Sequence, residues 1–202
     1  MKAWIYDLFF KNLSSYWYRQ VIEYLPKQAK VLDVGIGTGA SFFSQLSLVK
    51  EKELQWLGID INGPYLKACQ ERIDEENAGS HIQVREQSIY DLKESELLDA
   101  VYFSASFMLL PDQGQALDVA LDSLKPEGMI CFTQTFETKK APLMEIIKPL
   151  ISKFTTVDFG VVTYQEPFLQ LLAKHGLEAV HNKVMSTQGP REMRIIVAKR
   201  TT

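Results

Sequence analysis

Short runs rich in β-branched and aromatic residues alternate along this chain with stretches whose apolar residues recur every three or four positions. The first pattern predicts buried strands and the second predicts helices that pack through one face. The strands predicted in this way are Lys30–Val34, Gln55–Ile61, His81–Arg85, Asp99–Ser104 and Met129–Thr135. Regular alternation of strand and helix is typical of a parallel sheet covered by helices on both faces.

Helix boundaries are predicted from capping residues. One helix follows residue 39 and carries Phe42, Phe43, Leu46 and Val49 on one face. Asn62 caps the next helix, which Gly79 is expected to close, and Asp112 caps a third. The third helix is expected to stop at the turn 125–128, before the fifth strand.

The C-terminal part departs from this alternation. Residues 141–152 are predicted to be helical, 154–162 irregular or a short strand, and 166–174 helical, ending at His175 and Gly176. Strands 177–185 and 193–199 follow each other across a turn at 189–190, so they should pair antiparallel. The chain is therefore expected to form one α/β domain over residues 1–202, with a mixed sheet and one reversed strand near its edge.

The N-terminal segment, Trp4 to Tyr24, reads as a helix that Pro26 ends, and it is unusually aromatic. Two interpretations are open for residues 1–26. They form a helix packed on the sheet, or a lid that closes over bound ligands, with Tyr6 or Tyr18 contacting the ligand.

Composition narrows the classes of partner. Lys and Arg total 22, Asp and Glu 25, and the formal net charge is −3, which disfavours binding to nucleic acid phosphates. The two cysteines, Cys69 and Cys131, have no metal-ligand spacing. After the fourth strand, Asp112 is the one carboxylate available and is predicted to cap a helix, so no metal is expected. No apolar run approaches the length of a membrane span, and no cleavage site follows the apolar N-terminus. We therefore expect a cytoplasmic protein with no membrane partner.

A glycine-rich loop, Gly35-Ile36-Gly37-Thr38-Gly39, lies between the first strand and its helix, which is typical of nucleotide-binding sites and also of tight turns. Asp60 ends the second strand, where a carboxylate can accept hydrogen bonds from ribose hydroxyls. Asp33, two residues before the loop, would repel a pyrophosphate at the helix N-terminus. The loop should instead suit a ligand that carries positive charge.

The residues Val31–Ala40 (VLDVGIGTGA) resemble motif I of the class I S-adenosylmethionine-dependent methyltransferases. Four further segments resemble this family in the same order: Gly58–Ile61, Gln87–Leu92, Asp99–Ser104 and Leu124–Gly128. The resemblance covers about residues 30 to 136. It implies a doubly wound, Rossmann-like sheet of seven strands with an antiparallel C-terminal strand. It also implies S-adenosylmethionine as methyl donor and S-adenosylhomocysteine as product.

The resemblance also implies roles for individual residues. The implied cofactor-binding set is Asp33, Gly35, Ile36, Gly37, Thr38, Gly39, Asp60, Ile61, Ser88, Ile89, Ser104 and Tyr6. Asp33 would serve the ammonium group directly or through water, Asp60 the ribose hydroxyls, and Ile61 the adenine. Ser88 and the backbone of Ile89 would meet the adenine edge, and the Ser104 carbonyl the methionine part. Ser88 stands where many relatives have Asp, and Ile36 where many have a smaller residue or Cys.

A small-molecule acceptor is our first hypothesis, with nitrogen, oxygen and sulfur nucleophiles all compatible and residues 138–163 as a substrate-recognition segment. A methyltransferase acting on protein or RNA is an alternative. It lacks support because residues 104–107 (SASF) match neither an Asn-Pro-Pro-Tyr segment nor paired glutamates. A non-catalytic protein that binds S-adenosylmethionine is another alternative, and an NAD-dependent dehydrogenase is disfavoured by Asp33.

No catalytic residue is assigned by the sequence, because methyl transfer needs alignment more than a general base. Glu137 is a candidate cation-binding group or base, although a solvated carboxylate at a helix start is the favoured reading. Gln134 and Thr135 also follow the fifth strand, and Tyr164 is a candidate hydrogen-bond donor. The sequence carries no signal for an oligomeric state.

Overall fold

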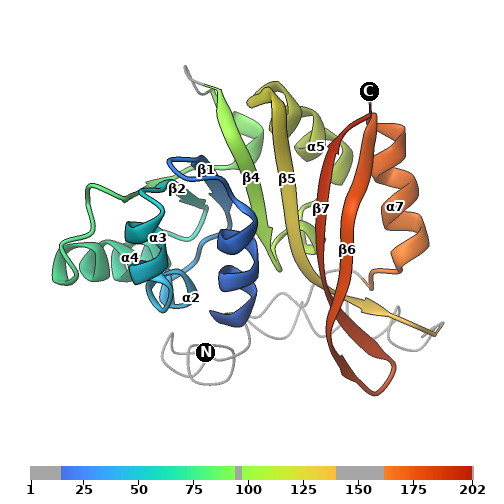
Figure 1. The fold of residues 1–202 in the computed structure, drawn as a ribbon, viewed down its shortest axis with the longest axis horizontal. Coiled ribbons are helices and arrows are strands. Elements are labelled where there is room, and N and C mark those ends of the chain that lie inside the picture. Colours follow the sequence, from blue (N-terminus) through green and yellow to red (C-terminus); the bar gives the residue numbers. More distant parts are fainter. Residues whose placement is uncertain (1–14, 94–96, 140–161, 202) are drawn as a thin grey trace.

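The computed structural model of the chain describes residues 15–93, 97–139 and 162–201, which include a seven-stranded sheet in the order β3-β2-β1-β4-β5-β7-β6 (Figure 1). The strands are β1 (Lys30–Val34), β2 (Gln55–Asp60), β3 (Ile82–Glu86), β4 (Leu98–Ser104), β5 (Leu124–Glu137), β6 (Leu177–Gln188) and β7 (Arg191–Arg200). The strands from β3 to β5 are parallel, and β7 is antiparallel to both of its neighbours. The predicted fold class is confirmed, and the reversed strand is β7.

Helices cover both faces of this sheet (Figure 1). Residues 15–24 are helical. The other helices are α2 (Ala40–Phe43), α3 (Leu46–Glu51), α4 (Gly63–Glu75), α5 (Gln113–Asp122) and α7 (Gln165–Lys174), with 3₁₀ turns η1 (Ile89–Asp91) and η2 (Phe107–Leu109). Helix 15–24 and α2 to α4 pack on one face, and η1, η2, α5 and α7 on the other. The sheet is thus buried from both sides over its centre.

Successive residues of each central strand enter opposite cores. On β4, Tyr102 belongs to the core under helix 15–24, and its neighbour Phe103 belongs to the core under α5 and α7. On β1, Val31 and Leu32 divide in the same way. This alternation explains why these strands read as continuous apolar runs in the sequence.

The predicted helix caps are partly confirmed. The Asn62 side chain accepts a hydrogen bond from the Tyr65 N–H, and Asp112 accepts one from the Gln115 N–H, so both residues cap as predicted. Gly79 does not close α4, which ends at Glu75. The chain then turns through Asn77 with φ of 48°, a left-handed conformation that asparagine tolerates better than most residues.

Two other boundaries differ from the sequence prediction. The single helix expected after the glycine loop is divided into α2 and α3, because the chain leaves helical geometry at Gln45, with φ of −115°. The predicted turn 125–128 falls inside the span of β5, where the pairing with β4 shifts register between Leu98 and Ala100. In both cases the apolar residues of the predicted elements still reach the core.

Helix 15–24 is held to the sheet by buried side chains and by polar contacts at both ends. Tyr18, Val21 and Ile22 are at most 2% exposed. At its far end, the Lys52 ammonium donates to the backbone carbonyls of residues 22, 23 and 25, where helix carbonyls lack intrahelical partners. The prediction of a helix is confirmed for residues 15–24. Residues 1–14, with Tyr6, and the segments predicted at 141–152 and 154–161 lie outside the described residues.

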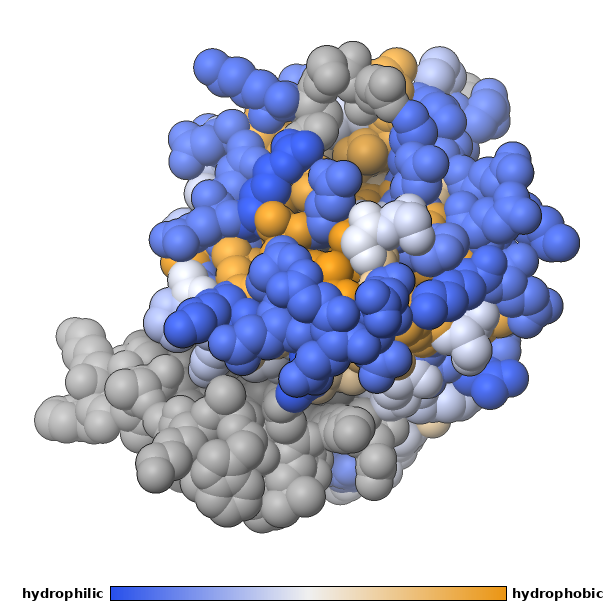
Figure 2. Space-filling view, turned by 90° about the vertical axis from the view of Figure 1, so that its left-hand side faces the viewer, coloured by the Kyte–Doolittle hydropathy of each residue, from blue (hydrophilic) through white to orange (hydrophobic). Residues whose placement is uncertain are grey.

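The edge of the sheet at β3 faces the viewer in Figure 2, where hydrophilic side chains surround apolar atoms. A shallow groove of about 810 Å³ lies there, lined by the end of α4 and by β3, with Ile73, Ile82 and Val84 among its residues. It lies at the amino end of β3, away from the glycine loop at the carboxyl end of β1.

Candidate functional site

The glycine-rich loop leaves the carboxyl end of β1 with Gly35, Gly37 and Gly39 all at positive φ (81°, 61° and 68°). A Cβ at Gly35 would lie 2.7 Å from the Ser106 Cβ, and one at Gly39 would lie 2.6 Å from the Cys69 Sγ. A Cβ at Gly37 would meet no atom within 4 Å. The outer glycines are therefore required by packing, whereas the middle one borders open space where a ligand can approach the backbone.

The Asp60 carboxylate lies against this middle glycine. Its Oδ2 accepts a hydrogen bond from the Gly37 N–H at 2.9 Å, and its Oδ1 accepts one from the Asn62 N–H at 2.9 Å. Each carboxylate oxygen keeps capacity for another donor. The neighbouring Ile61 side chain is 77% exposed, which is unusual for a large apolar residue. This geometry is compatible with the ribose and adenine roles predicted for Asp60 and Ile61.

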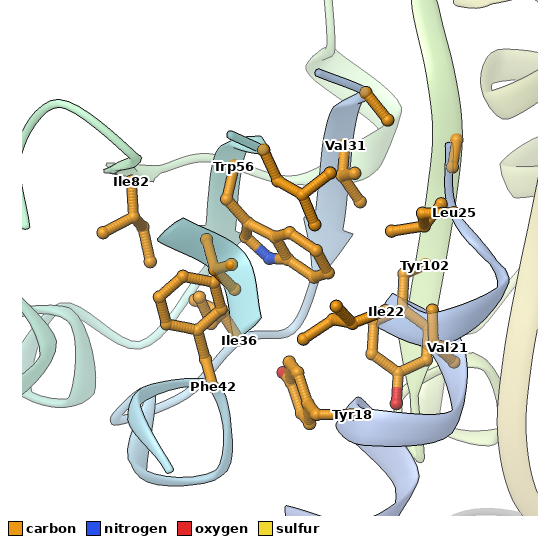
Figure 3. Packing of buried hydrophobic residues seen from close by; sticks show 14 of the residues in the cluster. Tyr18, Val21, Ile22, Leu25, Val31, Ile36, Phe42, Trp56, Ile82 and Tyr102 are labelled. Carbon is orange, nitrogen blue, oxygen red and sulfur yellow. The ribbon is translucent and has the colours of Figure 1, made fainter. Parts of the chain in front are cut away.

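Asp33, in contrast, is fully buried beneath the loop. Its Oδ2 accepts hydrogen bonds from the Tyr18 hydroxyl (2.7 Å) and from the Trp56 indole N–H (2.9 Å). Its Oδ1 is buried and has no hydrogen-bond partner among the described residues. Figure 3 shows Tyr18 from helix 15–24, Trp56 from β2 and Tyr102 from β4 gathered in one core. An unpartnered buried carboxylate oxygen fits a ligand that brings a donor group.

Burial sets the protonation of these groups. Burial, with a smaller contribution from the charge of Asp60, raises the pKa of Asp33 from 3.8 to about 7, although the hydrogen bonds from Tyr18 and Trp56 oppose the rise. Burial also raises the pKa of Tyr18 well above its usual value, so this phenol remains a hydrogen-bond donor at neutral pH. A cation placed near Asp33 would favour its charged form.

The other predicted cofactor residues are brought to the same edge of the sheet. The Gln87 N–H donates to the Asp60 carbonyl at 3.0 Å, which holds the segment of Ser88 and Ile89 beside the end of β2. The Ser88 hydroxyl accepts from the Tyr90 N–H and caps η1, and the Ile89 side chain is buried in the core. The Ile89 backbone, not its side chain, is thus the part compatible with the predicted adenine contact.

The chain leaving β4 is tied to the glycine loop. After Ser104, Ala105 adopts a φ of 53°, and the hydroxyl of Ser106 donates to the carbonyl of Val34. A left-handed alanine is strained, and such strain is common where a chain must turn at a functional site. The sequence places Ser106 directly after the fourth predicted strand, on the side of the site, but its contact with the loop could not be predicted because it depends on the pairing of β1 with β4.

Two predicted loop residues face inward instead. The Ile36 side chain is 6% exposed and packs on Gly58, where an added Cβ would lie 2.6 Å from the Ile36 Cδ1. Thr38 is 7% exposed. Both residues therefore shape the loop from its inner side, and the backbone of the loop is the part that borders open space.

Glu137 differs from both readings made from the sequence. It is the last residue of β5, not the start of a helix, and its side chain is only 5% exposed. Its Oε1 accepts from the Arg191 Nε at 2.8 Å across the β5–β7 pair. The expectation of a solvated carboxylate is wrong, because register places a cation opposite it. Tyr164 precedes α7, and Gln134 is 1% exposed with both amide atoms unpartnered among the described residues.

Across the part of the chain that the structure describes, no three His, Cys, Asp or Glu side chains cluster as metal ligands would. Over the same ranges, no helix is long and apolar enough to cross a membrane.

Comparisons with known proteins agree with this geometry. A family model described as a methyltransferase domain matches residues 31–128, from β1 into β5. The carboxy-S-adenosyl-L-methionine synthase of Erwinia tasmaniensis is 22% identical over 125 residues, which make up 61% of this chain and 51% of that protein. The chain thus spans about half the length of this curated relative.

Two solved structures share the fold. The geranyl diphosphate C-methyltransferase of Streptomyces coelicolor A3(2), solved with Mg²⁺, geranyl diphosphate and S-adenosylhomocysteine, aligns with a TM-score of 0.76 at 13% identity, covering 94% of this chain and 80% of that one. An S-adenosylmethionine-dependent methyltransferase of Thiobacillus denitrificans, solved with S-adenosylhomocysteine, aligns with a TM-score of 0.67 at 13% identity, covering 94% and 92%. At such identities the likeness concerns the fold.

Proposed function

We propose that this chain, whose residues 31–128 match a methyltransferase domain model, is a class I S-adenosylmethionine-dependent methyltransferase that transfers a methyl group from S-adenosylmethionine to a small-molecule acceptor. One observation carries the proposal. The N–H of Gly37, which a pyrophosphate would need, already donates to the Asp60 carboxylate. The loop therefore presents negative charge where a dinucleotide site presents donors, and it suits a ligand bearing an ammonium and a sulfonium.

In this proposal each residue keeps the role that its position supports. Asp60, fixed by two backbone N–H groups, accepts the ribose hydroxyls through its remaining lone pairs. Ile61 offers exposed apolar surface to the adenine, and Ser88 with the Ile89 backbone meets the adenine edge. The Ser104 carbonyl, at the end of β4, would meet the methionine part.

Bound S-adenosylmethionine supplies a methyl group on a sulfonium, which an acceptor nucleophile takes by in-line displacement. The protein's own contribution is alignment of the two reactants and exclusion of water. Glu137 is excluded as a free general base by its ion pair with Arg191 and by its burial. In this proposal the acceptor loses its proton without the help of Glu137.

A compact acceptor is supported by the net charge of −3, which does not favour nucleic acid, and by a fold neighbour solved with geranyl diphosphate. The expectations of no metal and of a cytoplasmic location belong to the same proposal. Since one relative bears the name of a carboxy-S-adenosyl-L-methionine synthase, methyl transfer itself must be demonstrated and not only cofactor binding.

Calorimetric titration with S-adenosylhomocysteine tests the site. Asp60→Ala should weaken binding by about 1–3 kcal/mol, the usual effect of removing hydrogen bonds made by a charged group. Asp118→Ala is the matched control, because its carboxylate pairs with His175 on the far side of the sheet. An unchanged dissociation constant in Asp60→Ala would contradict the ribose assignment.

Methyl accounting tests the reaction. The protein is incubated with methyl-labelled S-adenosylmethionine and fractionated metabolite pools, with total protein and total RNA as parallel acceptors. The proposal expects label in a small molecule together with an equal amount of S-adenosylhomocysteine. Label only in protein or RNA would replace the small-molecule acceptor with a polymer, and no label in any pool would leave a non-catalytic protein that binds the cofactor.

A further inference from the structure

Helix 15–24 is joined to the strand that carries the glycine loop by one buried hydrogen bond, from the Tyr18 hydroxyl to Asp33. We propose that Tyr18 is a positioning residue for the cofactor site: it fixes the Asp33 carboxylate so that only Oδ1 is left for the ligand. This inference rests on the proposed function, since it concerns the same ligand.

The proposal starts from the three polar contacts that hold this helix. Ser15 bonds the Ser44 hydroxyl at 2.6 Å near the start of the described helix, and Lys52 donates to three carbonyls at its end. Tyr18 lies between them. Of these contacts, the one made by Tyr18 reaches the carboxylate that precedes the glycine loop. Tyr18 is therefore the described contact through which this helix bears directly on the carboxylate beneath the loop.

The two donors on Asp33 determine which of its oxygens is available. Tyr18, which precedes Asp33 in the chain, and Trp56, which follows it, both donate to Oδ2. The other oxygen, Oδ1, has no partner among the described residues. The Tyr18 ring is further restrained by edge contacts with Tyr102 (5.1 Å between centroids) and Phe42 (6.5 Å). A phenol held in this way prevents the carboxylate from turning, so its free oxygen keeps one direction.

The groups around Asp33 determine how strongly the Tyr18 contact affects the pKa of this carboxyl group. The titratable groups around it are Tyr18 from helix 15–24, Asp60 from the end of β2, Cys69 from α4 and Tyr102 from β4. Among the described residues none of these groups brings positive charge. Burial and the charge of Asp60 together raise the pKa of Asp33 to about 7, and the Tyr18 bond is the larger of the two hydrogen bonds that oppose the rise. Loss of the hydroxyl should therefore make Asp33 harder to ionise.

The experiment compares Tyr18→Phe with Lys52→Met, which loosens the same helix without touching Asp33. Affinity for S-adenosylhomocysteine is measured by calorimetry from pH 5.5 to 8.5. In the wild type we expect the affinity to rise as pH increases, with a midpoint near pH 7, because the ammonium of the ligand favours ionised Asp33. Tyr18→Phe should weaken binding at pH 7 about tenfold and move the midpoint up by about one pH unit, whereas Lys52→Met should leave the midpoint in place.

A second measurement needs no ligand. The indole N–H of Trp56 donates to Asp33, so its proton resonance should titrate with the carboxyl group, and Trp56→Phe assigns the signal. The midpoint should again rise in Tyr18→Phe and remain fixed in Lys52→Met. Equal midpoints in all three proteins would overturn the proposal, whatever the affinities.

The outcomes separate the two proposals. Wild-type binding with an unmoved midpoint in Tyr18→Phe removes the positioning role and leaves the methyltransferase assignment intact. Failure of the wild type to bind S-adenosylhomocysteine removes both the proposed function and the role of Tyr18 in a cofactor site, even if the Trp56 resonance still follows Asp33.

Discussion

The two cores of this protein are built differently although they share the same strands. The core under helix 15–24 contains polar groups that pair with one another: Asp33 with Tyr18 and Trp56, and the Tyr102 hydroxyl with Thr133 at 2.7 Å. The core under α5 and α7 contains a phenylalanine cluster, with ring centroids 5.0 to 5.8 Å apart: Phe103, Phe107, Phe132, Phe136 and Phe168. The buried hydrogen-bonded groups thus lie on one face of the sheet and the packed phenylalanine rings on the other.

Gln134 is the exception on the phenylalanine side. It shares its face of β5 with Phe132 and Phe136, which are about 13 Å apart along an extended strand. The Phe168 ring lies 5.1 Å from the Phe132 ring and 5.3 Å from the Phe136 ring, so it bridges the two rings on the face of β5 that also carries Gln134. The Gln134 amide is thus buried on an aromatic face, and neither of its polar atoms has a hydrogen-bond partner among the described residues.

The largest effect should come from removing a ring of the phenylalanine cluster. Phe132 is fully buried and contacts Phe103, Phe107 and Phe168. Phe132→Ala should lower the free energy of unfolding by about 3–5 kcal/mol, measured by urea titration. Leu109→Ala, at a side chain 40% exposed, should change it by less than about 1 kcal/mol. Equal losses in both variants would show that the phenylalanine cluster contributes no more to the free energy of unfolding than a half-exposed side chain does.

The next effect concerns pH, and it belongs to the other core. The pKa of Asp33 is about 7 in the folded protein, above its usual 3.8, so the folded state binds more protons than the unfolded state between these values. The Asp33 contribution to stability is therefore fully present at low pH and is lost as pH rises toward 7, by up to about 4 kcal/mol.

Asp33→Asn should remove this contribution. The measurement is the free energy of unfolding of both proteins at pH 5 and pH 8, taken as a difference so that other groups cancel. The wild type should lose stability relative to the variant on going to pH 8. A difference that does not change with pH would mean that the buried carboxyl is already ionised at pH 5.

A smaller effect of opposite sign is expected at Gln134. Gln134→Met keeps the length of the side chain and removes two buried polar groups that lack partners, so it should stabilise the protein by about 1 kcal/mol. Thermal unfolding measures the change, and Gln83→Met on the β3 edge is the control, with no expected gain. Destabilisation by Gln134→Met would show that the amide is satisfied in solution.

The sequence predicted the features that depend on residues close together in the chain, such as strand bounds, helix caps and the glycine loop. The bounds of β1 follow from its apolar run, and Asn62 and Asp112 cap their helices because the capping residue and the bonded N–H lie three positions apart. The glycine loop was predicted for the same reason, since its three positive φ angles favour glycine at each position.

Features that depend on tertiary register were not predicted. Tyr18 is 15 residues and Trp56 is 23 residues from Asp33 in the sequence. These side chains meet only after helix 15–24 packs on β1 and β2. Glu137 meets Arg191 across 54 residues through the register of β5 with β7. A change of one residue in that register would turn each side chain to the other face, so no local pattern reports the pairing.

The insertion of β7 between β5 and β6 has a consequence for biosynthesis. A ribosome delivers β5 and then β6 before it delivers β7, yet β5 reaches its final neighbour on that side only through residues 191–200. During this interval the nascent chain carries a long strand with one bare edge, and such an edge can recruit strands from other chains. Translation that stalls before Arg191 should therefore yield a product that aggregates. Pairing of β7 with β5 is the folding step that removes the open strand edge and with it this route to aggregation.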